Sequence, residues 1–556
     1  HGNWISGIKF IDNARLGNQE SLPGELRDNP GRNRYFMLPL LIGLLGIIWQ
    51  FRKDKRGLIL VFSFFIMTGL AIIFYLNQYP NQPRERDYAF AASFYAFAMW
   101  IGLGVFSIYE MIKKYMNKNV AAGVATVACL SVPTILAAQN WDDHNRSNRY
   151  LTRDIAKAYL DSCAPNAILF ANGDNDTFPL WYPQEVEGYR TDVRICNLSL
   201  MGTDWYIDQM KRQAYDGLPV PMKMTKEMYQ MGYRDMLFAF NTIKEPQDLG
   251  SVMNNIMFNP NNHIRLPRIN TITFTLNVDK EKVLANGTVS TKDSAIIVDK
   301  LVWRMPNESI YQTNGKDTVM VVSKAYIAMM DILANNNWER PIYYVSTTTP
   351  DCFFGLEKYF QVEGLAYRLI PIEADYNETR GSFNGRVNSD VLYDNVMNKF
   401  DFSEYADPNI YLSEDYTRTV QNLKVFMYRL ADKLIMENDI ERAKKVIERC
   451  YEWFPKSTTP FGLVDLYLGE SYMKCQSKEA AEKGLAIFDD FADQLNSENE
   501  YYMSFRGKHT SMVSYSLNYN RNILNGITQF VNQYRNIYPE LSEKFKFTEE
   551  KAKKYL

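Results

Sequence analysis

The feature that most constrains this 556-residue chain is a set of long stretches without charge. Residues 35–138 contain only 13 Asp, Glu, Lys or Arg residues, and these are clustered. Four uncharged runs lie between the clusters: residues 35–51, 57–83, 88–109 and 119–141. Each approaches the roughly 20 apolar residues with which an α-helix crosses about 30 Å of hydrocarbon. The sequence therefore predicts four transmembrane helices within residues 35–138.

The alternative is four buried helices of a soluble domain, but such helices seldom occur as consecutive uncharged runs separated by short charged clusters. Basic residues predict the orientation, because Lys and Arg are enriched in cytoplasmic loops. The loop at 52–56 carries four of them and the loop at 110–118 carries three, against two in the loop around Arg84. Both ends of the helical block should then face outward. We expect a multi-pass protein of the inner (cytoplasmic) membrane with a large periplasmic C-terminal region.

The chain opens with HGNWISG, which contains neither an initiating Met nor an apolar signal segment. A segment that begins outside the cytoplasm needs an upstream segment to carry it across the membrane. We therefore expect this chain to be the C-terminal part of a longer membrane protein. The charges balance, with 62 Lys and Arg against 64 Asp and Glu. Without a basic excess, no nucleic-acid partner is expected. The four histidines and six cysteines show no metal-ligand spacing, so no metal site is assigned.

After the last apolar run, the pattern becomes that of an α/β protein. Buried or half-buried strands are predicted at residues 167–171, 193–200, 271–278 and 341–346. Helices are predicted at residues 149–162, 180–188, 205–215 and 322–335. The short connections between the first two strands indicate a parallel strand–helix–strand unit. Residues 217–268, rich in Met, Asn and Pro, are interpreted as an insertion of mixed helix and loop.

From about residue 416 the pattern is wholly helical. Two helix–turn–helix segments begin near Leu430 and Leu468, a spacing close to the tetratricopeptide period of about 34 residues. A generic helical bundle is the alternative, since two copies are few for a solenoid. The predicted fold class is a multidomain membrane protein: transmembrane helices, an extracytoplasmic α/β domain and a C-terminal all-α tetratricopeptide-like region. Its parts are an extracytoplasmic loop (1–34), four transmembrane helices (35–138), the α/β domain (139–395) and the helical region (396–556).

The first candidate site is the charged cluster between the second and third apolar runs, within NQPRERDY. Arg84 and Arg86 could bind a donor phosphate through paired guanidinium hydrogen bonds. Glu85 and Asp87 are the candidate catalytic groups, because a carboxylate could accept the proton of an acceptor hydroxyl. The alternative is that these charges end a helix and pair with one another. Arginine is uncommon in outward-facing loops, because basic residues are enriched on the cytoplasmic side. Two arginines in this loop therefore favour a functional role.

The second candidate follows the predicted strand at 167–171, where Asp174, Asn175 and Asp176 are the outer-domain ligand candidates. Ligands of α/β sheets bind beyond the carboxyl ends of strands. Two carboxylates two residues apart could hold one divalent cation through oxygen, although the calcium-loop pattern fails at Phe178. Asp and Asn are also typical of turns and helix N-caps. A cation site and a structural turn are therefore both open.

Several segments of the chain together resemble a known family. In order, they are RNRYFMLPLLIGLLGI, NQPRERDYAF, AILFANGDNDTFPLWYPQEVEGYRTDVRICNLSLM, NNWERPIYY and FGLEKYFQVEGLAYRLIP. From the first apolar run to about Ile372, the chain is similar to a large family of bacterial polytopic membrane proteins. That family was long catalogued as a domain of unknown function and is related to the eukaryotic transmembrane protein O-mannosyltransferase. The helical end also resembles the family's tetratricopeptide-like tail.

The resemblance implies an integral-membrane glycosyltransferase of the GT-C type. Such an enzyme transfers a sugar from a lipid-phosphate donor, here a polyprenyl-phosphate sugar, to a protein hydroxyl on the outer face. Membrane lipid and a protein acceptor are the partners implied, and no cofactor is assigned. The catalytic acid of such enzymes generally lies in the first outer loop, which we expect upstream of this chain, so the catalytic residue stays unassigned.

The rival hypothesis is a membrane-anchored periplasmic scaffold or assembly factor. It would bind protein partners through the helical repeats, as repeat surfaces commonly do. A transporter fits less well, because the interiors of the four apolar runs hold no ionisable residue of the kind that transport pathways use.

Overall fold

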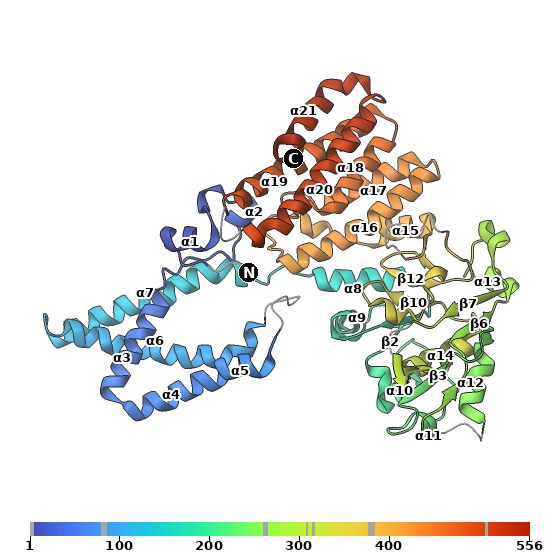
Figure 1. Cartoon of the computed structure of the whole chain (residues 1–556), viewed down its shortest axis with the longest axis horizontal. Helices are drawn as coiled ribbons and strands as arrows, with labels where there is room; N and C mark the ends of the chain where they lie inside the picture. The colour runs from blue at the N-terminus through green and yellow to red at the C-terminus, as the bar shows by residue number, and fades with distance from the viewer. Residues whose placement is uncertain are drawn as a thin grey trace.

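The computed structural model describes residues 5–78, 86–259, 265–306, 310–313, 317–375, 384–505 and 510–556. Figure 1 shows three regions in these residues. A group of apolar helices occupies one end, a mixed α/β region the other, and a set of C-terminal helices lies above and between them. Two short helices, α1 (Lys9–Leu16) and α2 (Gly24–Arg27), precede the apolar group.

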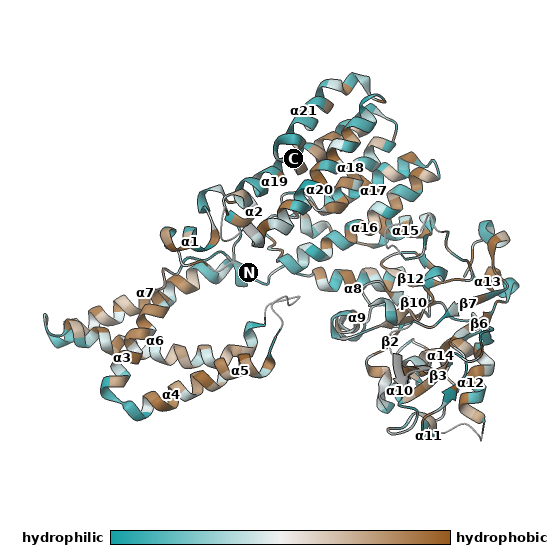
Figure 2. Ribbon diagram, viewed as in Figure 1, coloured by the Kyte–Doolittle hydropathy of each residue, from teal (hydrophilic) through white to brown (hydrophobic). Residues whose placement is uncertain are grey.

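The apolar group contains helices that are long and hydrophobic enough to cross a membrane. Its helices are α3 (Leu38–Lys53), α4 (Lys55–Thr68), α5 (Leu70–Leu76), α6 (Ala91–Ile112) and α7 (Lys118–His144). Three continuous helical spans reach membrane length within the described residues: Lys55–Leu76, Asp87–Ile112 and Lys118–His144. Hydrophobic colouring dominates α4, α5 and α6 in Figure 2. The apolar window of Lys55–Leu76 is 0% buried by protein, so this surface needs an apolar medium around it.

The prediction of four membrane-spanning helices is wrong by one. The first uncharged run forms α3, which has 16 residues and so extends about 24 Å at 1.5 Å per residue. Its start is delayed because Phe36 and Met37 take positive φ angles of 51° and 57°, and Pro39 stands in the first turn. The helix is therefore shorter than the hydrocarbon layer it was expected to cross.

Helix α6 lies against α3, α4 and α7. The indole N–H of Trp100 on α6 donates a 2.8 Å hydrogen bond to Gln50 on α3, inside the protein. At one end of these helices, Lys53 Nζ lies 3.5 Å from a carboxylate oxygen of Glu110. The two basic loops, which follow α3 and α6, therefore lie at the same end of the helical group.

A six-stranded mixed sheet forms the centre of the α/β region. Its strands are β1 (Ile168–Ala171), β2 (Arg194–Asn197), β10 (Ile342–Val345), β11 (Phe360–Val362), β12 (Ala366–Leu369) and β13 (Arg386–Val387). Their order is β13-β11-β12-β10-β1-β2. β1 runs parallel to both β2 and β10, whereas β12 is antiparallel to β10 and β11. The predicted strand–helix–strand unit is present as β1, α9 (Asp174–Glu187) and β2.

Two smaller sheets extend the α/β region. Their strands are β3 (Met236–Phe240), β4 (Gln247–Asp248), β5 (Arg268–Ile269), β6 (Thr273–Asn277), β7 (Lys300–Arg304), β8 (Ile310–Thr313) and β9 (Asp317–Ser323). The orders are β5-β3-β9-β8 and β4-β6-β7. The associated helices are α10 (Asp204–Met210), α11 (Lys226–Tyr229), α12 (Leu249–Phe258), α13 (Lys280–Ala285) and α14 (Lys324–Asn336). The stretch 217–268 therefore contains strands as well as the predicted helix and loop. Strand β3 pairs with β9, which lies about 80 residues later in the chain, so its pairing depends on tertiary context.

The C-terminal region consists of helices packed in sequence order. They are α15 (Ser389–Asp394), α16 (Glu414–Met436), α17 (Ile440–Trp453), α18 (Leu463–Lys474), α19 (Lys478–Met503), α20 (Thr510–Arg535) and α21 (Ser542–Ala552). Helix α16 packs on α17, and α18 on α19. Their membership of the tetratricopeptide class stays a prediction. One buried apolar cluster runs from Leu151 on α8 (Leu151–Ser162) to Ala552, so this region and the α/β region share a continuous core.

Candidate functional site

A cavity of about 540 Å³ lies where the central sheet meets the C-terminal helices. Its wall includes the loops that follow β1 and β10, with residues of α8 and α16 completing it. After β1 the chain continues to β2 on one side, whereas after β10 it continues to β11 and β12 on the other. The place where the chain leaves two neighbouring parallel strands in opposite directions is the usual ligand position of open α/β sheets.

Asp174, Asn175 and Asp176 all line this cavity. They form the first turn of α9, which begins three residues after β1 ends. Gly173 precedes the helix with a φ of 74°, a conformation that glycine adopts without steric cost. The sharp turn from strand to helix therefore places the three side chains at the carboxyl edge of the sheet.

Asp176 is held by a residue from the neighbouring strand's loop. Thr347 donates a 2.6 Å hydrogen bond from its Oγ1 to Oδ1 of Asp176. Burial raises the pKa of the Asp176 carboxyl above its ordinary value, while the Thr347 hydroxyl acts in the opposite direction. The cavity wall thus carries a half-buried acidic group stabilised by a neutral hydroxyl.

Hydroxyl groups dominate the rest of the polar lining. The hydroxyl of Tyr159, a buried residue of α8, lies 2.9 Å from Ser346 Oγ at the end of β10. Thr152 Oγ1 and the Tyr416 hydroxyl are 3.4 Å apart and join α8 to α16. The remaining polar residues of the wall are Asn172, Thr348, Thr349, Thr419 and Asn422. Such groups both donate and accept hydrogen bonds without adding charge.

The cavity has an acidic character. Among the described residues that line it, Asp174 and Asp176 are the only charged ones. The apolar part of the wall is formed by Ile155, Ala156, Pro179, Leu180, Leu365, Leu423 and Phe426. This combination of apolar surface and a few convergent polar groups is typical of small-molecule sites.

The residues around the cavity offer few ligands to a metal ion. In the part of the chain that the structure describes, no group of three or more His, Cys, Asp or Glu side chains is arranged to hold one. A calcium ion at Asp174 and Asp176 would need waters and neutral oxygens for most of its six to eight ligands. A divalent cation at these positions therefore stays a prediction.

The charged cluster before α6 is described only in part, because Arg84 and Glu85 lie outside the described residues. Arg86 caps η2 (Asp87–Phe90), a short turn that leads into α6. Within the described residues, the Nε of Arg86 is buried and has no hydrogen-bond partner. Asp87 is exposed. Arg86 thus lies at the end of α6 opposite to Glu110 and the basic loops.

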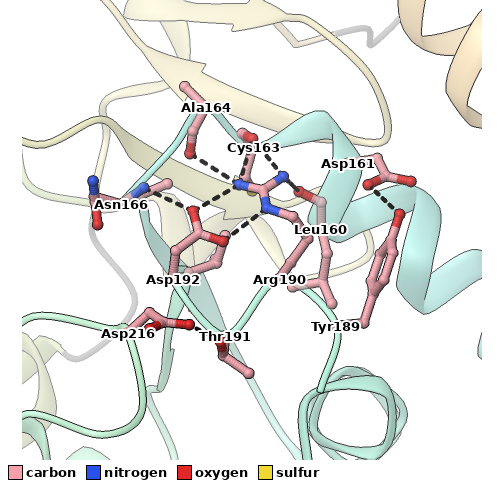
Figure 3. A network of polar contacts seen from close by, with 12 residues as sticks. Leu160, Asp161, Cys163, Ala164, Asn166, Tyr189, Arg190, Thr191, Asp192 and Asp216 are labelled. Atoms are coloured by element: carbon pink, nitrogen blue, oxygen red, sulfur yellow. Dashed lines mark hydrogen bonds and ion pairs between the residues drawn. The ribbon is translucent and has the colours of Figure 1, made fainter. Parts of the chain in front are cut away.

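Figure 3 shows a second polar cluster, whose labelled residues, apart from Asp216, precede β1 or β2 in the chain. None of its labelled residues lines the cavity. Arg190 pairs with Asp192 through two contacts, Nε to Oδ1 at 2.8 Å and Nη2 to Oδ2 at 3.0 Å. The same guanidinium donates to the carbonyl oxygens of Leu160 and Cys163 at the end of α8, at 2.7 and 3.0 Å. Because protein groups occupy these donors, the cluster ties α8 to the loop before β2 and is not a ligand site.

Much of the cavity wall could not be predicted from the sequence. Thr347 lies 171 positions from Asp176 along the chain. One local pattern does point to the wall. The hydroxyl residues 346–349 lie at the carboxyl end of the strand predicted at 341–346, where ligands of α/β sheets bind. No local signal marks Tyr416 or Asn422, because the packing of α16 places them.

The structure thus combines three membrane-length helices with an α/β region that carries a polar cavity at the carboxyl edge of its main sheet. Residues 152–391 match the family described as TMEM260-associated domain 2. This stretch contains all six strands of the main sheet and the two loops at their carboxyl edge. No curated protein and no solved structure matches the chain.

Proposed function

We propose that this chain is the C-terminal part of an integral-membrane glycosyltransferase that resembles protein O-mannosyltransferases. It would use a lipid-phosphate-linked sugar and transfer the sugar to a protein hydroxyl on the periplasmic face of the inner membrane. The observation that carries the proposal is the match of residues 152–391 to TMEM260-associated domain 2, directly after three helices of membrane length. A transferase that uses a lipid-linked donor needs both a membrane-embedded part and an outer part that meets the acceptor.

Arg86 is the described arginine of the charged cluster before α6, and we assign it to the donor phosphate. Its Nε is buried and has no partner within the described residues, and a buried guanidinium nitrogen without an acceptor is costly unless a ligand supplies one. A phosphate diester offers acceptor oxygens that match the planar guanidinium. Arg84 is proposed to share this role, and Glu85 and Asp87 remain the candidate catalytic groups on sequence grounds.

The test is transfer of labelled hexose from a polyprenyl-phosphate donor to protein in membranes that contain the full-length protein. We expect Arg86→Ala to lower the transfer rate by about tenfold to a hundredfold, as the loss of one charge-assisted contact does. Arg56→Ala is the matched control, because Arg56 is an exposed arginine in the first turn of α4, and its replacement should leave transfer unchanged.

If the Arg86→Ala protein transferred sugar as fast as the wild type, Arg86 would not be a ligand of the donor phosphate. The proposal that the protein is a transferase would still hold. Absence of transfer by the full-length wild-type protein would instead favour the periplasmic scaffold or assembly factor. In that case the helical region would bind protein partners and no chemistry would occur.

A further inference from the structure

We infer that the cavity between the main sheet and α16 binds a neutral saccharide, at a site separate from the centre of sugar transfer. Three features of the cavity carry this inference: its position in the fold, its charge, and the chemistry of its lining. None of them depends on the transferase reaction.

The position is that of a ligand site in open α/β sheets. The loops after β1 and β10 leave neighbouring parallel strands toward opposite sides of the sheet, which opens a crevice at the carboxyl edge. Helix α16 of the C-terminal region covers this crevice with Tyr416, Thr419 and Asn422. Ligand pockets occur preferentially between packed regions of this kind, and the cavity of about 540 Å³ lies within their usual range of roughly 300–1,000 Å³.

The charge of the cavity excludes anionic ligands. Two carboxylates, Asp174 and Asp176, line it, and none of its described lining residues is a Lys, Arg or His. A phosphate, a nucleotide or a carboxylate would be repelled and would find no cationic side chain among the described lining residues to compensate it. Sugar phosphates and the lipid-phosphate donor are therefore poor occupants, which separates this cavity from the proposed donor site near Arg86.

The lining matches the hydroxyl groups of a sugar. A carboxylate offers about four lone-pair sites to donors, and Asp176 receives hydrogen bonds from the Thr347 hydroxyl and from the backbone of Asn172, which leaves capacity for a ligand. The hydroxyls of Tyr159 and Ser346, which lie 2.9 Å apart, can each donate and accept. Phe426 and Leu180 supply apolar surface for the carbon-bound hydrogens of a sugar ring. A neutral polyhydroxyl ligand matches both kinds of surface, whereas a purely apolar ligand would leave the remaining hydrogen-bonding capacity of Asp176 and of the hydroxyls unused.

The test uses the purified full chain in a detergent whose headgroup contains no sugar. Neutral methyl glycosides of mannose, glucose and galactose are titrated at millimolar concentration and followed by calorimetry and by saturation-transfer NMR. Mannose 6-phosphate and an unglycosylated Ser/Thr-rich peptide are the comparison ligands. We expect at least one neutral glycoside to bind saturably and the two comparison ligands not to bind.

Two variants and one control locate the binding. Asp176→Asn should weaken binding at least tenfold, because a neutral amide is a weaker acceptor than a carboxylate. Thr419→Trp should abolish it, since the indole projects from α16 into the cavity without altering the sheet. Asp204→Asn should bind as the wild type does, because Asp204 begins α10 as Asp174 begins α9 but does not line the cavity.

Saturable binding that both variants lose and the control keeps supports the inference, provided that the unfolding temperatures match. Three results would overturn it: no saturable binding of any neutral glycoside, binding that Thr419→Trp leaves unchanged, or binding of the bare peptide alone. Failure of the transferase proposal is distinguishable, because this binding needs no donor and Arg86→Ala should not affect it.

Discussion

At the scale of the residue, Asp331 on α14 is a completely buried acid. It accepts the backbone N–H of Met224 at 2.9 Å and the side-chain amide of Asn335 at 2.7 Å. Burial raises its pKa above the ordinary value of 3.8, although the backbone donors act in the opposite direction. The folded protein therefore binds a proton at this residue more readily than the unfolded chain does.

The contribution of Asp331 to the free energy of unfolding therefore depends on pH. As the pH falls through the raised pKa toward 3.8, the folded state gains stability from Asp331, at up to about 1.4 kcal/mol per pH unit. As the pH rises through the same window, that contribution is lost. Asp331→Asn cannot titrate, so the difference in unfolding free energy between wild type and variant should depend on pH in this window. Thermal unfolding of both proteins at a series of pH values measures it, and a constant difference would contradict the assignment.

At the scale of the element, the contact between α3 and α6 depends on glycine. A Cβ on Gly104 of α6 would lie 2.3 Å from the carbonyl oxygen of Ile42 on α3, and a Cβ on Gly46 would lie 1.8 Å from the carbonyl oxygen of Trp100. Small residues let membrane helices approach closely, where packing and hydrogen bonds hold them together. This closeness also allows the hydrogen bond from Trp100 to Gln50.

Gly104→Val should therefore separate the two helices and destabilise the membrane part by about 1–3 kcal/mol, the usual cost of overpacking. The matched control is Gly102→Val on the same helix, because a Cβ at Gly102 would meet nothing within 4 Å. The unfolding temperature of each variant in detergent is the measurement. Equal stability of the two variants would show that α3 and α6 do not pack through Gly104.

At the scale of the whole molecule, the continuous core predicts that the α/β region and the C-terminal helices unfold together. Within the C-terminal helices, Lys424 on α16 and Asp465 on α18 form a fully buried ion pair at 3.0 Å. The Tyr451 hydroxyl and the backbone N–H of Gly462 also donate to Asp465, at 3.0 and 2.8 Å. Asp465→Asn leaves a buried ammonium without its counter-charge, which typically costs about 3–5 kcal/mol.

Hydrogen exchange should detect this loss in both regions. We expect the amides of β1 to exchange faster in Asp465→Asn, as those of α18 do, because the apolar cluster that contains them is continuous. Asp493→Asn is the control, since Asp493 pairs with Lys551 at the surface and should change stability by no more than about 1 kcal/mol. Faster exchange confined to α16–α21 would show that the regions unfold separately.

The sequence by itself determined the features that depend on neighbouring residues. Three of the four uncharged runs form helices of membrane length, because charge is expensive in hydrocarbon whatever the surrounding fold. The apolar segment 167–171 followed by Gly173 and Asp174 determined a strand, a turn and a helix start, because glycine and aspartate act locally. The position of Asp174, Asn175 and Asp176 beyond a strand could be predicted on the same grounds.

Only the tertiary structure decided which distant groups meet. It brought Thr347 to Asp176 across 171 positions and laid Tyr416 of α16 over the same cavity. It also paired β3 in the stretch 217–268 with β9. Such contacts come from many weak packing terms summed over the whole chain, so no short segment specifies them. The loop after β1 could be predicted from its own residues. The cavity around it, in contrast, exists only because three distant segments pack there.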